Sequence, residues 1–287
     1  MKRIVVTGAN GQLGKCIRDS AQNFPDLDML FASKQELDID NSESVERYFS
    51  KNKFDYCINT AAYTNVEKAE SEPKKAYKTN AEGAKNLAVQ CNLNKTTLIQ
   101  VSTDYVFDGE KQSPYTEEDT CNPINVYGAS KLKGEHYVQA FCNQYFIFRT
   151  SWLYSQYGHN FFNTILKYSK EGKPLTITTE QTGTPTNAND LAKAILEIIS
   201  KGSNKYGIYN FSNKGEATWF DFAKAILSYT GQLNITKLAK TDHYRTFAAR
   251  PKYSVLDLDK YCKTVFNNTI DWEKSLQQLI KNKVFNS

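Results

Sequence analysis

A tyrosine and a lysine four positions apart carry the clearest chemical signal in this sequence of 287 residues. They stand in the string Tyr127-Gly128-Ala129-Ser130-Lys131. On a helix, positions i and i+4 share a face, so the phenol and the ammonium would point into the same cleft. A free tyrosine, with a pKa of about 10, exchanges protons poorly near neutral pH, and a nearby lysine cation would lower that pKa. The pair could then transfer a proton to or from a carbonyl oxygen.

This spacing alone is common and usually marks only an exposed helix face, but a second motif accompanies it. The string 102–107, Ser-Thr-Asp-Tyr-Val-Phe, follows a run that is typical of a buried strand. A hydroxyl at the carboxyl end of such a strand lies at the cofactor crevice of an open α/β sheet. Thr103 could therefore bond the same substrate oxygen, although an ordinary loop hydroxyl is the alternative. Together the two motifs predict Thr103, Tyr127 and Lys131 as catalytic residues.

A glycine-rich loop, residues 7–14 (Thr-Gly-Ala-Asn-Gly-Gln-Leu-Gly), follows the first predicted strand and opens the first predicted helix. Small residues let the backbone approach a pyrophosphate, and a helix N-terminus supplies free N–H groups and the positive end of its dipole. A tight turn with packing glycines is the alternative. The loop predicts a dinucleotide site built from Gly8, Asn10, Gly11, Gln12 and Leu13.

The residues after the second predicted strand bear on the choice of dinucleotide. NAD-binding proteins place an acidic residue there, about 20 positions beyond the loop, against the ribose. Ser33 and Lys34 stand there instead, and a hydroxyl and a cation suit a 2′-phosphate. NADPH is therefore favoured, with NADH possible, and a solvated loop is the alternative. Asp38 could accept a hydrogen bond from the adenine amino group while Ile39 packs on the ring.

Short apolar runs alternate with helical patterns through the first half of the chain. Strands are expected over 4–7, 29–32, 56–59, 98–102 and 146–149, and helices over 11–20, 41–51, 73–91 and 124–142. This alternation predicts a doubly wound α/β fold of the Rossmann type, a parallel sheet with helices on both faces.

After residue 150 the rhythm changes. Helices are expected over 160–171, 189–201 and 218–230, and Thr218 with Asp221 resembles a capping box. We therefore expect an NAD(P)-binding domain over 1–150 and a smaller, mostly helical substrate-binding lobe over 151–287, with some of its strands returning to the main sheet.

Composition excludes several function classes. The net charge is +5, from 36 basic and 31 acidic residues, with no clustered basic stripe of the kind that nucleic-acid binding requires. The six cysteines include no C-x-x-C pair, and only three histidines are present, which argues against a disulfide or metal framework. There is no apolar run long enough to span a membrane and no secretion signal, so a cytoplasmic protein is expected.

The glycine loop, Thr103 and the Tyr127–Lys131 pair resemble the extended short-chain dehydrogenase/reductase superfamily over nearly the whole chain. Within it, the sequence is similar to the dTDP-4-dehydrorhamnose reductases. The strings that carry this closer resemblance are residues 59–70, 102–107, 125–128, 149–154 and 249–251. It implies NAD(P)H-dependent reduction of the C4 keto group of dTDP-4-dehydro-L-rhamnose to dTDP-L-rhamnose, a donor for bacterial cell-surface polysaccharides.

The resemblance also implies residue roles. Tyr127 would protonate the developing alkoxide, Thr103 would orient it, and Lys131 would hold the nicotinamide ribose. Further cofactor contacts would come from Ala61, Ala62, Tyr63 and Asn80. The sugar nucleotide would contact Thr64, Val66, Thr103, Asp104, Tyr105, Val106, Trp152 and Arg250. Arg250 suits a phosphate because its charge is permanent and its donors form a fork; the alternatives are that Trp152 is core and Arg250 forms a surface ion pair.

Other functions remain open at this point. The superfamily's 4,6-dehydratases carry Thr-Asp-Glu where this chain has Thr103-Asp104-Tyr105, so the carboxyl acid that water elimination needs is missing. A non-catalytic, NADP-binding regulatory subunit of methionine adenosyltransferase has the same fold, and a reductase or epimerase of another nucleotide sugar would have the same motifs.

The expected assembly is a monomer or a metal-free homodimer. Some relatives dimerise around Mg²⁺ through acidic residues, one of them early in the first helix. Here that stretch, Lys15-Cys16-Ile17-Arg18, has no carboxylate before Asp19.

Overall fold

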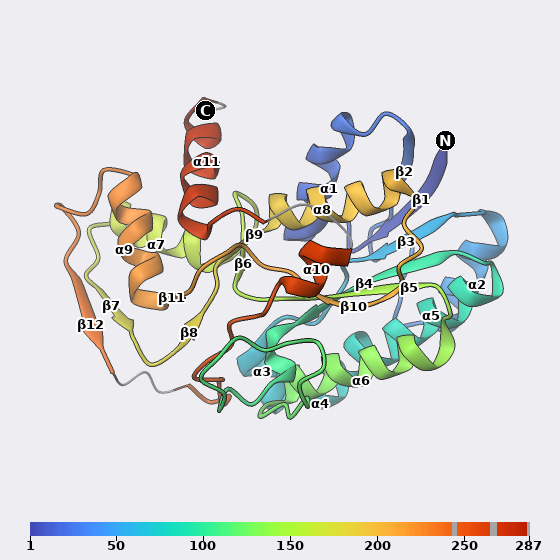
Figure 1. Ribbon diagram of the computed structural model, residues 1–287, viewed down its shortest axis with the longest axis horizontal. Helices are drawn as coiled ribbons and strands as arrows, with labels where there is room; N and C mark the ends of the chain where they lie inside the picture. The colour runs from blue at the N-terminus through green and yellow to red at the C-terminus, as the bar shows by residue number, and fades with distance from the viewer. Residues whose placement is uncertain (243–245, 265–268, 286–287) are drawn as a thin grey trace.

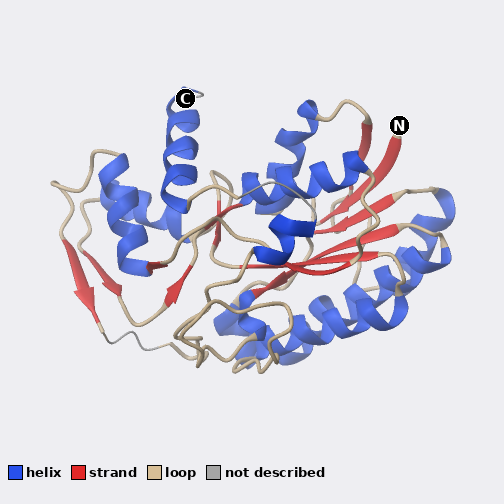
Figure 2. Ribbon diagram, in the orientation of Figure 1, coloured by secondary structure: helices blue, strands red, loops and turns tan. Residues whose placement is uncertain are grey.

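Six parallel strands form the central sheet, in the order β10-β5-β4-β3-β1-β2 (Figures 1 and 2). The computed structural model describes residues 1–242, 246–264 and 269–285. The strands are Lys2–Thr7 (β1), Leu27–Phe31 (β2), Tyr56–Asn59 (β3), Thr97–Thr103 (β4), Tyr145–Thr150 (β5) and Gly207–Asn210 (β10). β2 and β3 lie on opposite sides of β1, so the strand order reverses there and opens a crevice at the carboxyl ends. The predicted doubly wound α/β fold is confirmed.

Strand residues alternate between two apolar cores, as the two-residue period of a strand requires. Ile4 and Val6 of β1 pack with α1 (Gln12–Ser20) and α8 (Ala188–Lys201). Val5 faces the other core, which it shares with α2 (Ser42–Lys51), α5 (Ala84–Leu93) and α6 (Val126–Phe141). In Figure 1, α1 and α8 lie above the sheet and α2, α5 and α6 below it. Both faces are therefore covered.

The predicted helix over 73–91 is present but is not a uniform α-helix. It consists of α4 (Pro73–Tyr77), a π-helical segment η2 (Lys78–Gly83) and α5. Single π turns inside α-helices are often found at functional sites, and η2 carries Asn80. The short helix α3 (Val66–Ser71), just before it, was not predicted.

A third apolar core lies in the second half of the chain. Its main helices are α7 (Phe161–Lys170), α9 (Trp219–Tyr229) and α11 (Trp272–Phe285). The parallel pair β7 (Leu175–Thr178) and β12 (Leu238–Thr241) lies beside them. Thr218 caps α9, and the reciprocal bond from its backbone N–H to Asp221 completes the predicted capping box.

The second half also contributes to the main sheet. β10 pairs with β5, and α8 packs against α1. The division at residue 150 into cofactor and substrate parts stays a prediction. The remaining short elements are η1 (Ala21–Asn23), η3 (Asp104–Val106), β6 (Leu153–Tyr154), β8 (Thr182–Gly183), β9 (Thr186–Asn187), β11 (Ala217–Thr218) and α10 (Asp259–Thr264). Among the described residues, no helix combines the length and the apolar character that a membrane crossing needs.

Candidate active site

The glycine loop lies against the segment that follows β3. Gly8 has φ +63°, and a Cβ there would stand 2.6 Å from the backbone nitrogen of Ala61. A Cβ on Gly14 would stand 2.7 Å from the carbonyl oxygen of Gly8. A larger residue at position 8 would push the loop away from Ala61, and one at position 14 would push it away from α1. Gly11 occupies the N-cap of α1 without a side-chain cap, and no acidic residue stands in the first turn, so the helix start presents N–H groups suited to a phosphate.

Gln12, another predicted cofactor residue, uses its side chain inside the protein. Its amide nitrogen donates to the carbonyl of Leu153 at 3.1 Å, and its amide oxygen accepts from Asn160 at 2.6 Å. The predicted role of Gln12 therefore rests on its backbone. The side chain instead ties the glycine loop to the segment around β6.

Asn80 joins the predicted cofactor segment to the helix that carries Tyr127. Its side-chain oxygen accepts from the backbone nitrogen of Tyr63 at 2.8 Å. Its amide nitrogen donates to the carbonyl of Tyr63 at 3.0 Å and to the hydroxyl of Ser130 at 2.9 Å. Because Asn80 is only 2 % exposed, these bonds form a fixed link between β3 and α6. Ala61 and Ala62 precede Tyr63 on the same segment.

Thr103, Tyr127 and Lys131 come together where β4 ends beside the first turns of α6. Asn125 caps α6 by accepting from the backbone nitrogen of Gly128 at 2.7 Å. A Cβ on Gly128 would stand 2.0 Å from the carbonyl oxygen of Tyr105, so only glycine lets α6 approach η3 this closely. Lys131 donates to the carbonyl of Val101 at 2.6 Å. The predicted catalytic residues therefore share one site.

The pKa of Tyr127 is not lowered in this arrangement, although the Tyr127–Lys131 spacing had led us to expect a lowering. Burial raises the pKa of the Tyr127 phenol well above its usual value, Asp104 and Tyr105 add to the rise, and a hydrogen bond with Thr103 opposes it. Burial also lowers the pKa of Lys131 to about 8. The Lys131 ammonium donates to the carbonyl of Val101. Lys131 is not among the groups that lower the pKa of the Tyr127 phenol.

Among the predicted substrate residues, Asp104, Tyr105 and Arg250 form a connected group. Arg250 donates to the hydroxyl of Tyr105 at 3.1 Å and to the carboxylate of Glu67 at 2.7 Å. The ring of Tyr105 meets that of Tyr127 edge-on, with centroids 5.8 Å apart. Burial raises the pKa of Asp104 to about 6. Arg250 thus forms an ion pair with Glu67, as the alternative interpretation predicted. It also bonds Tyr105, whose ring contacts that of Tyr127.

Three other predicted substrate residues differ in exposure. Val106 is fully buried in an apolar cluster with Phe107, so the predicted contact with the sugar nucleotide would have to come from its backbone. Thr64 is exposed, and Val66 is half-buried at the first position of α3.

Trp152 stacks on Trp219, with ring centroids 3.6 Å apart and planes 5° from parallel. Its backbone has φ +42°, a strained value for a tryptophan, and a Cβ on Gly183 would stand 2.6 Å from its indole. The indole nitrogen of Trp219 donates to Gln181 at 2.9 Å. Trp152 is therefore held in one orientation by the second half of the chain.

Beyond these indoles lies a cavity of about 530 Å³. Phe161, Gln181, Trp219 and Arg250 are among the residues that line it. Sequence reasoning found Arg250 but missed the other three, because no motif marks them. The only available signal was the clustering of aromatic residues at the starts of the helices that became α7 and α9.

At the predicted ribose site, Lys34 is already paired. It binds Asp40 at 2.7 Å and Asp38 at 3.6 Å, and its side chain is 67 % exposed. The backbone nitrogen of Ser33 donates to Glu36 at 2.7 Å. Ile39 is 4 % exposed and belongs to the core below the sheet, so it offers little surface to an adenine ring. The cation that suits a 2′-phosphate is present, but it is paired with two carboxylates, those of Asp38 and Asp40.

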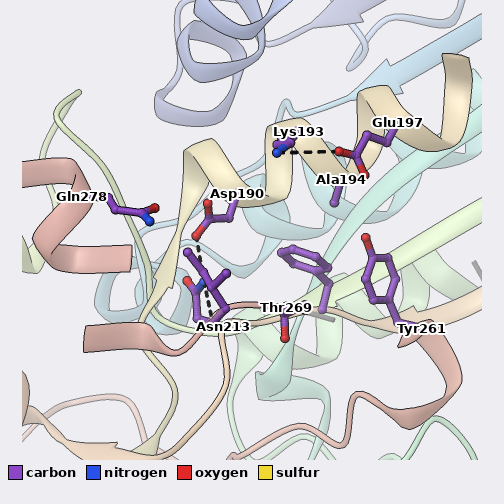
Figure 3. A pocket seen from close by; sticks show the side chains of 10 residues that line it. Asp190, Lys193, Ala194, Glu197, Asn213, Tyr261, Thr269 and Gln278 are labelled. Atoms are coloured by element: carbon purple, nitrogen blue, oxygen red, sulfur yellow. Dashed lines mark hydrogen bonds and ion pairs between the residues drawn. The ribbon is translucent and has the colours of Figure 1, made fainter. Parts of the chain in front are cut away.

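A second cavity, of about 310 Å³, lies over α8 and away from all the predicted site residues (Figure 3). Its polar side chains bind one another: Asp190 accepts from Asn213 at 2.7 Å, and Lys193 lies 3.9 Å from Glu197. The chemistry of the predicted site is therefore concentrated at the carboxyl ends of β1, β3 and β4.

Comparisons with known proteins agree with this site. The family described as "RmlD substrate binding domain" matches residues 1–285. A dTDP-4-dehydrorhamnose reductase of Sinorhizobium fredii is 37% identical over 97% of this chain and 96% of its own length. The crystal structure of dTDP-4-dehydrorhamnose reductase from Bacillus anthracis in complex with NADP is 38% identical, with a TM-score of 0.94 over 98% of this chain and 99% of that one. The corresponding Clostridium acetobutylicum structure is 39% identical, with a TM-score of 0.93 over 98% of this chain and 99% of that one. The chain therefore belongs to the RmlD substrate-binding-domain family, and the predicted resemblance is confirmed.

Proposed function

We propose that this protein reduces the C4 keto group of dTDP-4-dehydro-L-rhamnose with NADPH and forms dTDP-L-rhamnose. The observation that carries the proposal is the meeting of Thr103, Tyr127 and Lys131 at the carboxyl end of β4, on the sheet edge that also carries the glycine loop. Relatives named dTDP-4-dehydrorhamnose reductase at 37% and 35% identity, and a similar structure that contains NADP, support it. NADH is the alternative cofactor.

The residues of the crevice fit a dinucleotide. The start of α1, which has no side-chain cap, offers N–H groups to a pyrophosphate. At Gly8 there is no room for a Cβ beside Ala61. Gly8, Asn10, Gly11 and Leu13 would hold the phosphates, while Ala61, Ala62 and Tyr63 would line the opposite wall. NADPH supplies the hydride when bound. Lys131 would hold the nicotinamide ribose.

Tyr127 then acts as the proton donor. Burial raises the pKa of the phenol, so Tyr127 is protonated at neutral pH, and the alkoxide that develops on the substrate is a strong enough base to take that proton. The proton passes from the phenol to the substrate oxygen at C4, and a phenolate remains. Thr103, which bonds the phenol, orients the same oxygen. Lys131, which donates to the carbonyl of Val101, lies one helical turn from Tyr127 on the same face of α6.

The sugar nucleotide would lie between Tyr105 and the larger cavity. Its diphosphate would bind Arg250, and its base would enter the cavity beside Trp219, on which Trp152 stacks. A cavity of about 530 Å³ falls within the usual range of small-molecule sites. Gln181 supplies the polar group that could fix the base.

The direct test combines the purified chain, NADPH and dTDP-4-dehydro-L-rhamnose. Loss of NADPH absorbance that depends on the sugar, with dTDP-L-rhamnose identified by mass spectrometry, supports the proposal. Turnover only with a different keto sugar would favour the alternative that the protein is a reductase or epimerase of another nucleotide sugar. NADPH binding without any turnover, together with stoichiometric capture of a methionine adenosyltransferase, would favour the regulatory subunit.

A double substitution tests the cofactor preference. In S33D/K34A the cation is lost and a carboxylate faces the 2′-phosphate. Loss of a charge-assisted contact worth about 1.5–3 kcal/mol should weaken NADPH binding roughly 10- to 100-fold. NADH binding should change little, and both dissociation constants can be followed by nicotinamide fluorescence. The control K263A removes an exposed lysine that pairs with Asp259. An unchanged NADPH preference would show that Ser33 and Lys34 do not read the phosphate.

Arg250→Met tests the substrate assignment. The substitution removes the cation but leaves Glu67 39 % exposed, so the fold should persist. We expect KM for the sugar nucleotide to rise roughly 10- to 100-fold, with little change in NADPH affinity. Lys252→Met, two positions away and exposed, is the matched control. If KM is the same in the Arg250 and Lys252 variants, Arg250 is a structural ion pair only.

The proposal also includes the assembly and the location. We expect a monomer or a homodimer without metal, working in the cytoplasm. In the described ranges, no three or more His, Cys, Asp or Glu side chains gather in a way that could hold a metal, and the first turn of α1 carries no acid. Light scattering with and without a chelator tests this part.

A further inference from the structure

A buried carboxylate, Glu135, lies on α6 below the catalytic residues. Tyr127, Lys131 and Glu135 follow one another at intervals of four, so they share one face of the helix. Glu135 is 1 % exposed, and its partner Arg149 on β5 is 3 % exposed. The guanidinium holds the carboxylate through two nitrogens, with one contact of 2.8 Å and two of 3.2 Å. Two charges are thus fully withdrawn from water.

Glu135 also binds β4, at the place where Lys131 is held. The hydroxyl of Ser102 donates to Glu135. Ser102 stands between Val101, whose carbonyl receives the Lys131 ammonium at 2.6 Å, and Thr103. Ser102 pairs in register with Arg149 across β4 and β5. One carboxylate therefore ties the catalytic helix to the two strands that fix the other catalytic groups.

The same carboxylate acts electrostatically on Lys131. Burial lowers the pKa of Lys131 to about 8, and the charge of Glu135 opposes that decrease. Arg149, on β5, is engaged with Glu135 itself. Asp104 and Tyr105, on η3, act on Tyr127. Glu70, on α3, accepts from the backbone nitrogen of Val126, at the start of α6. Glu135 is thus the charged group that raises the pKa of Lys131.

We propose that Glu135 is a positioning residue that keeps Lys131 cationic and directed at the end of β4. This role rests on the proposed reductase function and adds a residue to its machinery. A buried ion pair adds little net stability compared with well-packed apolar side chains, so a functional reason for retaining these charges is physically reasonable. Without Glu135, burial would act on Lys131 unopposed and the ammonium would lose its proton at lower pH.

Glu135→Gln removes the charge and keeps the size of the side chain. We expect the alkaline limb of the kcat profile to move down by roughly one pH unit. KM for the sugar nucleotide should stay within about twofold, because Glu135 is 1 % exposed and bonds Ser102 and Arg149, neither of which is a predicted substrate residue. The NADPH dissociation constant, measured by fluorescence against pH, should show the same displaced limb, since Lys131 is the proposed ribose ligand.

Two variants separate charge from packing. Ser102→Ala removes a hydrogen bond to Glu135 but leaves its charge, so the alkaline limb should stay in place. Glu197→Gln removes a carboxylate from the Lys193 pair on α8 and should leave both profiles unchanged. If E135Q folds poorly, E135Q/R149M removes both buried charges and should move the limb in the same direction.

An unchanged limb in the glutamine variants, for both kcat and NADPH binding, would overturn the proposal and leave Glu135 a structural residue. An equal shift in S102A would show that packing, not charge, controls Lys131, and would also overturn it. If the wild-type protein turns over no sugar nucleotide, the proposed function fails, while the dependence of NADPH binding on pH still decides the role of Glu135.

Discussion

Tyr127→Phe should lower kcat by roughly a thousandfold, because general acid catalysis typically contributes 10²- to 10⁴-fold. The substitution removes only the hydroxyl that bonds Thr103, and the ring keeps its edge-on contact with Tyr105. KM for the sugar nucleotide and the NADPH dissociation constant should change little. Steady-state kinetics with fluorescence titration of NADPH measures all three quantities.

The matched control for this substitution is Tyr137→Phe. Tyr137 lies on the same helix, but its pKa is raised mainly by a hydrogen bond with Glu82, away from the cleft. Its loss should leave kcat within about twofold, as expected for a surface change without a special contact. Full activity in the Tyr127 variant would remove Tyr127 as proton donor and with it the assigned mechanism.

Arg149→Met should lower the free energy of unfolding by about 3–5 kcal/mol, because it leaves the buried carboxylate of Glu135 without its partner. The pair is 3 % and 1 % exposed, so water cannot replace the guanidinium without rearrangement. Urea unfolding followed by tryptophan fluorescence gives the difference.

An exposed ion pair gives the comparison for Arg149. Lys263→Met breaks the pair with Asp259; the two side chains are 74 % and 71 % exposed, so the free energy of unfolding should change far less than in the Arg149 variant. If the Arg149 variant loses no more free energy of unfolding than the Lys263 variant, the pair of Arg149 and Glu135 does not hold α6 against β4 and β5.

Local pattern was enough for the elements that build the crevice. The strand over 56–59 was predicted with the bounds that β3 has, because a short apolar run between polar segments has few other solutions. A strand of the second half was expected to return to the main sheet, but β10 was not located, because it is four residues long and pairs Gly207 with Phe146, far away in the sequence. The π-helical turn that carries Asn80 was equally hidden, because no local pattern marks it, and the bonds of Asn80 to Tyr63 and Ser130 span distant segments.

At the site, too, the spacing of residues could be read from the sequence, but their tertiary contacts could not. The four-residue spacing placed Tyr127 and Lys131 on one helix face, but it could not show that the ammonium lies on the carbonyl of Val101. Nor could it predict how burial acts on each group, which raises the pKa of one and lowers that of the other. The pairing of Glu135 with Arg149 needed the register of β4 against β5, and no local motif carries that register.

Hydride delivery to C4 of the sugar, with Tyr127 as proton donor, is the central claim, and isotope transfer tests it most directly. The protein would be given dTDP-4-dehydro-L-rhamnose and NADPH that carries deuterium on both faces of C4 of the nicotinamide. NMR of the isolated dTDP-L-rhamnose should then show one deuterium, at C4 of the sugar, with product formation nearly abolished in Tyr127→Phe. Product without deuterium at C4, or deuterated product formed at the wild-type rate by the Tyr127 variant, would contradict the mechanism.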